Sequence, residues 1–346
     1  MNKDTVSNAP DGQPFQLTEL HNAAGMTVSL MDWGATLLSI KVPMKDGRLR
    51  EVALGCARPE IWTQQNACLG ASIGRYANRI AYSRFELEGK TVQLVPNQGE
   101  HQLHGGPEGF NKRRWTVQYQ DDHSVLYALT SPDNDQGFPG TLHATARFTL
   151  HDDQRLTIDY KAKVDKPCPV NMTNHVYFNL DGHQGDIRHH RLQLFADSYL
   201  SVDKEGLPAR GLIAVDGTSF DFRQPKIIQQ DFLTDDDQRS VNGYDHAFLL
   251  RAQGDGQQAA AQVWSSNSDL QMSVYTTAPA LQVYTGNSLA GTPSRDGGHY
   301  AAWQGLALES EFLPDSPNHP EWPQPDCILR PGQPYQSVTE YQFNTL

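Results

Sequence analysis

Two runs of alternating apolar and polar residues, LHATARFTL at 142–150 and RLTIDYKAKV at 155–164, decide the fold class of this chain. Side chains of a β-strand point to opposite faces in turn, so each run would form a strand with one apolar face. The apolar positions are Leu142, Ala144, Ala146, Phe148, Leu150, Leu156, Ile158, Tyr160, Ala162 and Val164. The polar segment HDDQ at 151–154 is short enough for a turn. The stretch therefore predicts an antiparallel hairpin with one buried face.

Shorter runs of the same kind recur along the chain: MTVSLMDWG, TVQLV, RWTVQYQ, SVLYALTS, LQMSVYTT and ALQVYTG. Most of the 28 glycines and 21 prolines fall between these runs, where turns need them. Helical periodicity is weak and predicts only a turn or two near RPEIWTQQN and DDDQRSVNG. We therefore predict an all-β protein, either a large sandwich or an open barrel.

No composition shift or flexible linker divides the sequence, so we predict one domain over residues 1–346. The segment at 314–335, PDSPNHPEWPQPDCILRPGQPY, carries seven prolines. Its interleaved Trp322, Ile328 and Tyr335 indicate an anchored loop rather than a linker.

Composition and charge exclude several classes of protein. Hydrophobic residues make up 38% and charged residues 20%, which is typical of a folded chain. A net charge of −12 argues against nucleic acid or an anionic membrane as a partner, since both select clustered Lys and Arg. The N-terminal stretch has no apolar core of a secretory signal, and no run approaches the ~18 apolar residues of a membrane span. We therefore expect a cytoplasmic protein.

The four cysteines are scattered, with no CxxC pair among Cys56, Cys68, Cys168 and Cys327. This spacing disfavours a zinc ribbon, a redox dithiol and a disulfide framework.

The stretch NMTNHVYFNL at 171–180 combines three asparagines with a single histidine, His175. A core would avoid so many polar groups, which are costly to bury without partners, and a solvated surface would carry charges. The stretch is therefore typical of a pocket wall for a polar, uncharged ligand. A core histidine whose hydrogen bonds are satisfied is the alternative interpretation of His175.

Two segments before residue 105 also place polar groups among apolar or glycine neighbours. GRYANRIA contains Arg75, Asn78 and Arg79, and QLHGG contains His104 ahead of two glycines that allow close approach to a ligand. An arginine in a structural ion pair and a loop histidine are the alternatives. The HxxH spacing of HQLH does not predict a metal site, because residues three apart on an extended segment, here His101 and His104, face opposite sides.

Carboxylates occur in two further motifs. Asp245 of GYDHAF follows a glycine and a tyrosine and could simply form a turn. Glu309 and Glu311 of LALESEF follow an apolar run and share a face by period two. A carboxylate at a buried strand end has a raised pKa, which suits a general base. A solvated pair is the alternative.

Other chemistries lack their motifs: the sequence has no GxSxG, no Walker loop and no GxGxxG after a strand. The remaining amides, arginines, histidines and carboxylates suit the vicinal hydroxyls of a neutral sugar.

Taken together and in order, GRYANRIA, QLHGG, NMTNHVYFNL, GYDHAF, ALQVYTGN and LALESEFLPDSPNHP closely resemble the motifs of the aldose 1-epimerases, in particular the bacterial galactose mutarotases. The resemblance spans essentially the full length. It implies one large antiparallel β-sandwich of the galactose mutarotase-like superfamily. It also implies interconversion of the α and β anomers of free aldoses such as galactose and glucose, without a cofactor or metal.

The resemblance also assigns roles by motif position. His175 would be the general acid and Glu309 the general base. The residues that would hold or line the sugar site are Asn78, Arg79, His104, Tyr177, Asp245 and Gln282. The only partner implied is the small-molecule sugar, and the sequence leaves open a monomer or a homodimer.

One position departs from the family pattern, which carries an amide two residues after the base where this chain has Glu311. If Glu311 faces the pocket, repulsion would raise the pKa of Glu309 and leave open which carboxylate is the base. We favour Glu309 by motif position.

Three alternatives of other kinds follow from the same residues. A phosphosugar epimerase would need more converging cations than Arg75 and Arg79. A carbohydrate-binding module would not need an acid and a base together. A glycosidase using Glu309 and Glu311 would need its carboxylates ~5–9.5 Å apart with the sugar between them, which neighbours on one strand do not provide.

Overall fold

The computed structural model describes residues 7–182 and 185–346, and antiparallel strands dominate these ranges. The described residues contain two short α-helices, α1 (Pro59–Trp62) and α2 (Asp236–Ser240), both where the sequence predicts a helical turn. Single turns of 3₁₀ helix occur at Ala81–Ser83, Phe110–Lys112, Asp135–Gly137, Ile187–His189, Ile228–Asp231 and Ser316–Asn318. No helix in the described part of the chain is both long and apolar enough to cross a bilayer.

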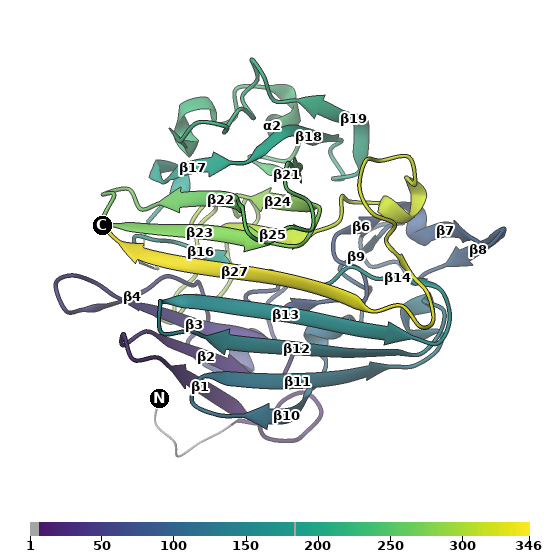
Figure 1. Cartoon of the computed structure of the whole chain (residues 1–346), viewed down its shortest axis with the longest axis horizontal. Coiled ribbons are helices and arrows are strands. Elements are labelled where there is room, and N and C mark those ends of the chain that lie inside the picture. The colour runs from purple at the N-terminus through teal and green to yellow at the C-terminus, as the bar shows by residue number, and fades with distance from the viewer. Residues whose placement is uncertain (1–6, 183–184) are drawn as a thin grey trace.

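The largest sheet has nine strands and contains the predicted hairpin (Figure 1). In spatial order its strands are β10 (Thr116–Gln120), β11 (Ser124–Ser131), β12 (Leu142–Leu150), β13 (Arg155–Val164), β27 (Tyr335–Thr345), β23 (Leu270–Thr276), β22 (Ala259–Trp264), β17 (Arg191–Leu194) and β20 (Lys226–Ile227). Strands β12 and β13 pair in register from Leu142↔Val164 to Leu150↔Leu156. The C-terminal strand β27, yellow in Figure 1, lies between β13 and β23 and joins the two halves of the sheet.

A second sheet of six strands carries Asp245, Glu309 and Glu311. In order its strands are β16 (Tyr177–Phe178), β25 (Leu306–Glu311), β24 (Ala280–Tyr284), β21 (Asp245–Leu250), β18 (Ala196–Val202) and β19 (Pro208–Ala214). All its pairs are antiparallel. Strand β25 is buried at every residue, unlike β12, whose burial alternates.

The N-terminal third adds a four-stranded sheet and short two-stranded ribbons. The sheet is β1 (Leu17–His21), β2 (Thr27–Met31), β3 (Thr36–Pro43) and β4 (Leu49–Glu51). The ribbons pair β5 (Ser72–Ile73) with β15 (Thr173–Asn174), β6 (Arg79–Ile80) with β9 (Gln102–Leu103), β7 (Arg84–Leu87) with β8 (Lys90–Gln93), and β14 (Cys168–Pro169) with β26 (Ile328–Leu329). The ribbons β5–β15 and β6–β9 bring motifs about 25 to 100 residues apart in sequence into contact.

One continuous apolar core joins the sheets. It includes Phe148 and Ile158 of the nine-stranded sheet, Phe178 and Leu308 of the six-stranded sheet, and Leu30 of the N-terminal sheet. Each apolar side chain buried in such a core stabilises the fold by roughly 1.5–3 kcal/mol. The prediction of an antiparallel β-sandwich is confirmed.

Candidate active site

The predicted site residues converge on one cavity of about 500 Å³. Seven of the eight line it: Asn78, Arg79, His104, His175, Tyr177, Asp245 and Glu309. The eighth, Gln282, is buried behind Asp245 and donates a hydrogen bond from Nε2 to Asp245 Oδ1 at 2.7 Å. These side chains come from β16, β21, β24 and β25 and from residues in or next to the ribbons β6–β9 and β5–β15.

His175 follows ribbon strand β15, and two backbone hydrogen bonds fix it. Its N–H donates to the Ala71 carbonyl at 2.9 Å, and its own carbonyl accepts from the Gly70 N–H at 2.9 Å. The neighbouring Asn174 donates from Nδ2 to the Gly70 carbonyl at 2.8 Å. The amide of Asn171 likewise donates to the Ala77 carbonyl at 3.1 Å. The asparagines of NMTNHVYFNL therefore shape the backbone, while His175 and Tyr177 face the cavity.

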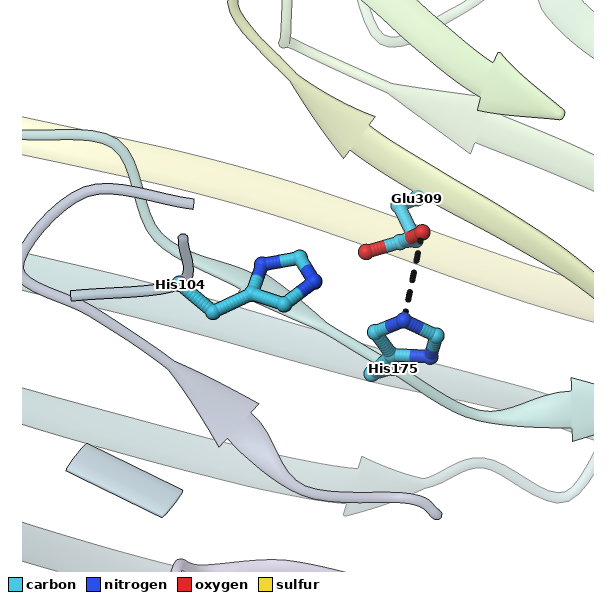
Figure 2. Close-up of side chains that lie close together, drawn as sticks. All are labelled: His104, His175 and Glu309. Atoms are coloured by element: carbon cyan, nitrogen blue, oxygen red, sulfur yellow. Dashed lines mark ion pairs between the residues drawn. The ribbon is translucent and has the colours of Figure 1, made fainter. Parts of the chain in front are cut away.

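His175 and Glu309 form the central pair of the cavity (Figure 2). The His175 Nε2 lies 3.5 Å from Glu309 Oε1, and the two side chains are 6% and 3% exposed. Glu309 comes from β25, where it sits opposite Gln282 of β24. Tyr177 lies beside the imidazole of His175, with ring centroids 4.8 Å apart. The cavity thus holds one potential proton donor and one potential acceptor next to each other.

His104 is locked in one tautomer by Asn78. The backbone N–H of Asn78 donates to the ring Nδ1 of His104 at 3.1 Å. The backbone N–H of His104 donates in turn to the Asn78 carbonyl at 3.1 Å. Burial lowers the pKa of His104 well below its ordinary value, so the ring is neutral. Because Nδ1 accepts a hydrogen bond, the ring proton sits on Nε2, which becomes a donor for a ligand in the cavity.

His104, His175 and Glu309 also have ligand atoms within 4.8 Å of one another, a spacing that could hold a metal ion. The sequence does not predict this triad. A metal needs an unprotonated nitrogen, whereas the free nitrogen of His104 is its protonated Nε2. The donor set therefore fits a hydrogen-bonding site better than a metal centre.

Arg79 contacts two segments that are distant in the chain, through Gln98 and Gly206. Its Nε donates to Gln98 Oε1 at 2.7 Å, and its guanidinium packs on the backbone of Gly206. A Cβ on Gly206 would lie 2.6 Å from Arg79 Cζ, and φ there is +80°, so only glycine permits this contact. The arrangement directs a fixed cation toward the cavity that Arg79 lines.

Burial shifts the protonation of the central residues toward neutral forms. It lowers the pKa of His175 to about 4 and, together with the charges of Glu311 and Asp245, raises the pKa of Glu309 well above its ordinary value. Burial also raises the pKa of Asp245. The carboxylate in contact with His175 is that of Glu309.

Glu311 does not line the site cavity, although it shares a strand with Glu309. Its side chain is buried, and its Oε1 accepts a hydrogen bond from Asn78 Nδ2 at 2.7 Å. The structure therefore supports Glu309 over Glu311 as the carboxylate facing a ligand.

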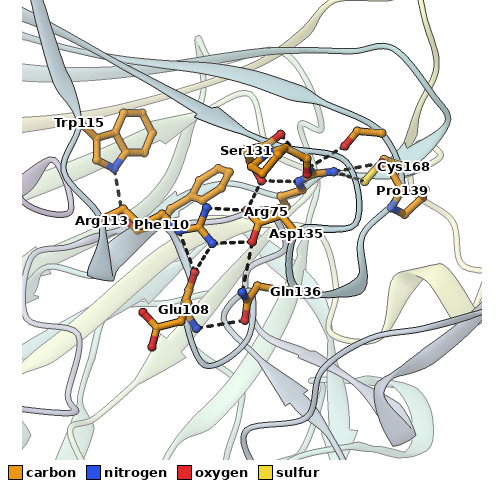
Figure 3. A network of polar contacts seen from close by, with 12 residues as sticks. Arg75, Glu108, Phe110, Arg113, Trp115, Ser131, Asp135, Gln136, Pro139 and Cys168 are labelled. Atoms are coloured by element: carbon orange, nitrogen blue, oxygen red, sulfur yellow. Dashed lines mark hydrogen bonds and ion pairs between the residues drawn. The ribbon is translucent and has the colours of Figure 1, made fainter.

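Arg75 is buried and makes no ion pair in the described residues, although a structural ion pair was the alternative interpretation of the arginines in its motif (Figure 3). It is 2% exposed and donates to neutral acceptors. These are Ser131 Oγ, Cys168 Sγ and the carbonyls of Ser131, Pro132, Pro139 and Gly140. Arg75 thereby ties the segment that carries Asn78 and Arg79 to the loop at 131–140.

Sequence reasoning missed much of the cavity rim. The other lining residues are Gln64, Gln65, Asn66, Ala67, Cys68, Gln98, Leu103, Tyr284, Ser288, Ala290, Gly291, Thr292 and Pro293. Of these, Tyr284 and Leu103 belong to the quoted motifs ALQVYTGN and QLHGG, and residues 64–66 belong to the predicted helical turn RPEIWTQQN. The rest lie in loops with no periodic pattern, so nothing in the sequence marks them.

Comparisons with known proteins agree with this fold. The profile of the aldose 1-epimerase family matches residues 16–342. The chain is 66% identical over 343 residues to the aldose 1-epimerase of Escherichia coli K12, covering 99% of both chains. It is 50% identical over 345 residues to that of Haemophilus influenzae, covering 99% of this chain and 100% of the relative.

Among solved structures, galactose 1-epimerase from Lactobacillus acidophilus superposes with a TM-score of 0.85 at 30% identity, covering 99% of this chain and 98% of that one. The chain therefore belongs to the aldose 1-epimerase family.

Proposed function

We propose that this protein interconverts the α and β anomers of free aldohexoses such as galactose and glucose, with His175 as general acid and Glu309 as general base. The observation that carries the proposal is the buried His175–Glu309 pair, 3.5 Å apart, in a cavity lined by hydrogen-bonding groups. Anomer exchange needs proton transfer at two oxygens, O1 and O5, that are bonded to the same carbon. An adjacent acid and base match that requirement.

The reaction opens and recloses the pyranose ring. Glu309 removes the proton from the hydroxyl on C1 while His175 gives a proton to the ring oxygen O5. The C1–O5 bond breaks and leaves an aldehyde, which rotates about C1–C2 and exposes its other face. The two residues then reverse their roles and close the ring. Each positioned proton transfer contributes roughly 10²–10⁴ in rate, about 3–5 kcal/mol.

The proton transfers of ring opening take the pair from its charged to its neutral form. Ring opening converts a charged imidazolium and carboxylate into a neutral imidazole and a carboxylic acid. Burial favours the neutral forms, because it lowers the pKa of His175 and raises that of Glu309. The charged pair that starts ring opening is therefore the less favoured form of the free site, and the neutral pair is the form that ring closure starts from.

The surrounding groups would hold the rest of the sugar while C1 rotates. His104 offers the Nε2 proton, Arg79 a fixed guanidinium and Asp245 a carboxylate held by Gln282. Asn78 and Tyr177 complete the wall. Rigid donors of this kind reduce the entropy lost in reaching the reactive geometry. The proposal assigns no step to a cofactor.

Polarimetry on freshly dissolved α-galactose tests the proposal. A trace of the protein should speed the approach to the same final rotation, because a catalyst changes the rate and not the equilibrium. His175→Asn should still bind galactose but lose two decades or more of turnover. Full activity in that variant would remove His175 from the acid role. No acceleration with galactose or glucose would contradict the function.

A further inference from the structure

Glu311 is a buried carboxylate that the mechanism above does not use. Residues 309 and 311 are two apart on β25, so both side chains point to the same face. Only Glu309 reaches the cavity, and Glu311, 1% exposed, lies one step further along the strand. An ionisable group this deeply buried destabilises the fold unless something nearby compensates it, so its contacts indicate its role.

The amide of Asn78 stands between Glu311 and the cavity. Its Nδ2 donates to Glu311 Oε1 at 2.7 Å, while its Oδ1 accepts from the Arg79 N–H at 2.9 Å. Rotating the amide by half a turn would bring Oδ1 against the carboxylate and the NH₂ group against the Arg79 N–H. Both contacts would then be repulsive, so Glu311 allows a single orientation.

The orientation of Asn78 also affects its neighbours in the cavity wall. The backbone of Asn78 exchanges two hydrogen bonds with His104, and the next residue is Arg79. Asn78 itself has φ +66°, a conformation that asparagine tolerates but rarely adopts without support. Glu311 thus anchors the segment that presents three of the sugar-facing side chains.

The environment of Glu311 favours its protonated form. Burial raises the pKa of Glu311 to about 8, and the carbonyl oxygen of a protonated carboxyl group can still accept the hydrogen bond of Asn78. The other titratable or charged groups facing Glu311 are Asp245, Arg79, Tyr76 and Tyr335. Arg79 and the Asn78 hydrogen bond favour the ionised form, and Asp245 opposes it.

We propose that Glu311 is a positioning residue that fixes the amide of Asn78 through its carboxyl group. This inference rests on the proposed function. Substitutions of Glu311 can keep or remove the acceptor that Asn78 needs.

Glu311→Gln keeps an acceptor for Asn78. The KM for galactose should stay within about twofold, because the amide remains held.

Glu311→Leu removes the acceptor. Leaving the buried amide of Asn78 without its partner should raise the KM for galactose by roughly tenfold. Calorimetric binding of galactose should weaken by a similar factor, a readout that does not depend on turnover. Glu340→Gln on β27, which removes a carboxylate paired with Arg155 outside the cavity, is the matched control and should change neither KM nor the pH profile.

An unchanged galactose affinity in Glu311→Leu overturns the positioning role, and so does a loss of affinity in Glu311→Gln as large as that in Glu311→Leu. A change in melting temperature alone would make Glu311 purely structural. If Glu311→Leu does not fold, Glu311→Met, which also lacks the acceptor, gives the same comparison with Glu311→Gln. An inactive wild type would contradict the proposed function, whereas an active wild type with unaltered variants would contradict only this inference.

Discussion

Strands β12 and β25 belong to the same molecule but follow opposite rules. In β12 buried and less buried residues alternate, and its buried residues are Leu142, Ala144, Ala146, Phe148 and Leu150. In β25 every residue is buried, including Glu309 and Glu311. Buried carboxylates destabilise a fold unless they are paired. The residues that cost the fold stability are therefore in β25, the strand that borders the candidate active site.

The largest expected effect comes from removing the charge of β25 that faces the cavity. Glu309→Gln should lower kcat by roughly 10²–10⁴, because the C1 hydroxyl loses its proton acceptor. Its free energy of unfolding should be unchanged or higher, because a neutral amide costs less to bury than a carboxyl group that can ionise. Polarimetry and urea unfolding measure the two quantities. Near-normal turnover would show that β25 is not specialised for catalysis.

The opposite outcome is expected in the regular hairpin. Ile158→Ala in β13, at a fully buried position, should lower the free energy of unfolding by roughly 2–5 kcal/mol, because it leaves a cavity in the core. The kcat per folded molecule should not change, since Ile158 does not line the site. Lys161→Ala on the exposed face of the same strand is the control and should shift stability by less than about 0.5 kcal/mol. A lower kcat in Ile158→Ala would show that the hairpin also contributes to catalysis, as β25 is expected to.

A smaller effect is expected one strand away from Glu309. Gln282→Leu in β24 removes the hydrogen bond that holds Asp245. The KM for galactose should rise roughly fivefold, corresponding to about 1 kcal/mol, while kcat changes little. Steady-state polarimetry over a range of galactose concentrations separates the two constants. A large drop in kcat with normal KM would place Gln282 in the chemistry instead.

The smallest effect concerns stability against pH. The pKa of Glu311 is about 8 in the folded protein, above the ordinary value of a glutamate, so the folded state holds this proton more tightly than the unfolded state. Its contribution to stability is therefore complete below the ordinary pKa and is lost as pH rises toward 8. Glu311→Gln should melt at a higher temperature than the wild type near pH 8, with a smaller difference near about pH 5. Equal differences at both pH values would mean that Glu311 does not titrate in this range.

The prediction of the fold succeeded where the pattern was regular. The alternation at 142–164 predicts β12 and β13 because burial of one face imposes period two on the sequence. The two helical turns were also predicted from local signals. The ribbons β5–β15 and β6–β9 were not predicted, because strands of two residues are too short to show periodicity.

The site residues were proposed from motif position, and seven of the eight line the cavity. The roles of their supports were not predictable. Arg75 resembled a surface or ion-paired arginine, and only its surroundings show six hydrogen bonds to neutral acceptors. The acceptors lie at least 56 residues away in the chain, beyond any local signal.

By itself the sequence determined the strands, because burial of one face imposes an alternating pattern on their residues. Its resemblance to a known family also proposed an acid and a base. The tertiary structure alone decided that Glu309 faces the cavity while Glu311 holds Asn78, and that His104 carries its proton on Nε2. It also set the directions in which the pKa values of His175 and Glu309 shift. These properties depend on burial and on neighbours distant in the chain, and neither is encoded locally.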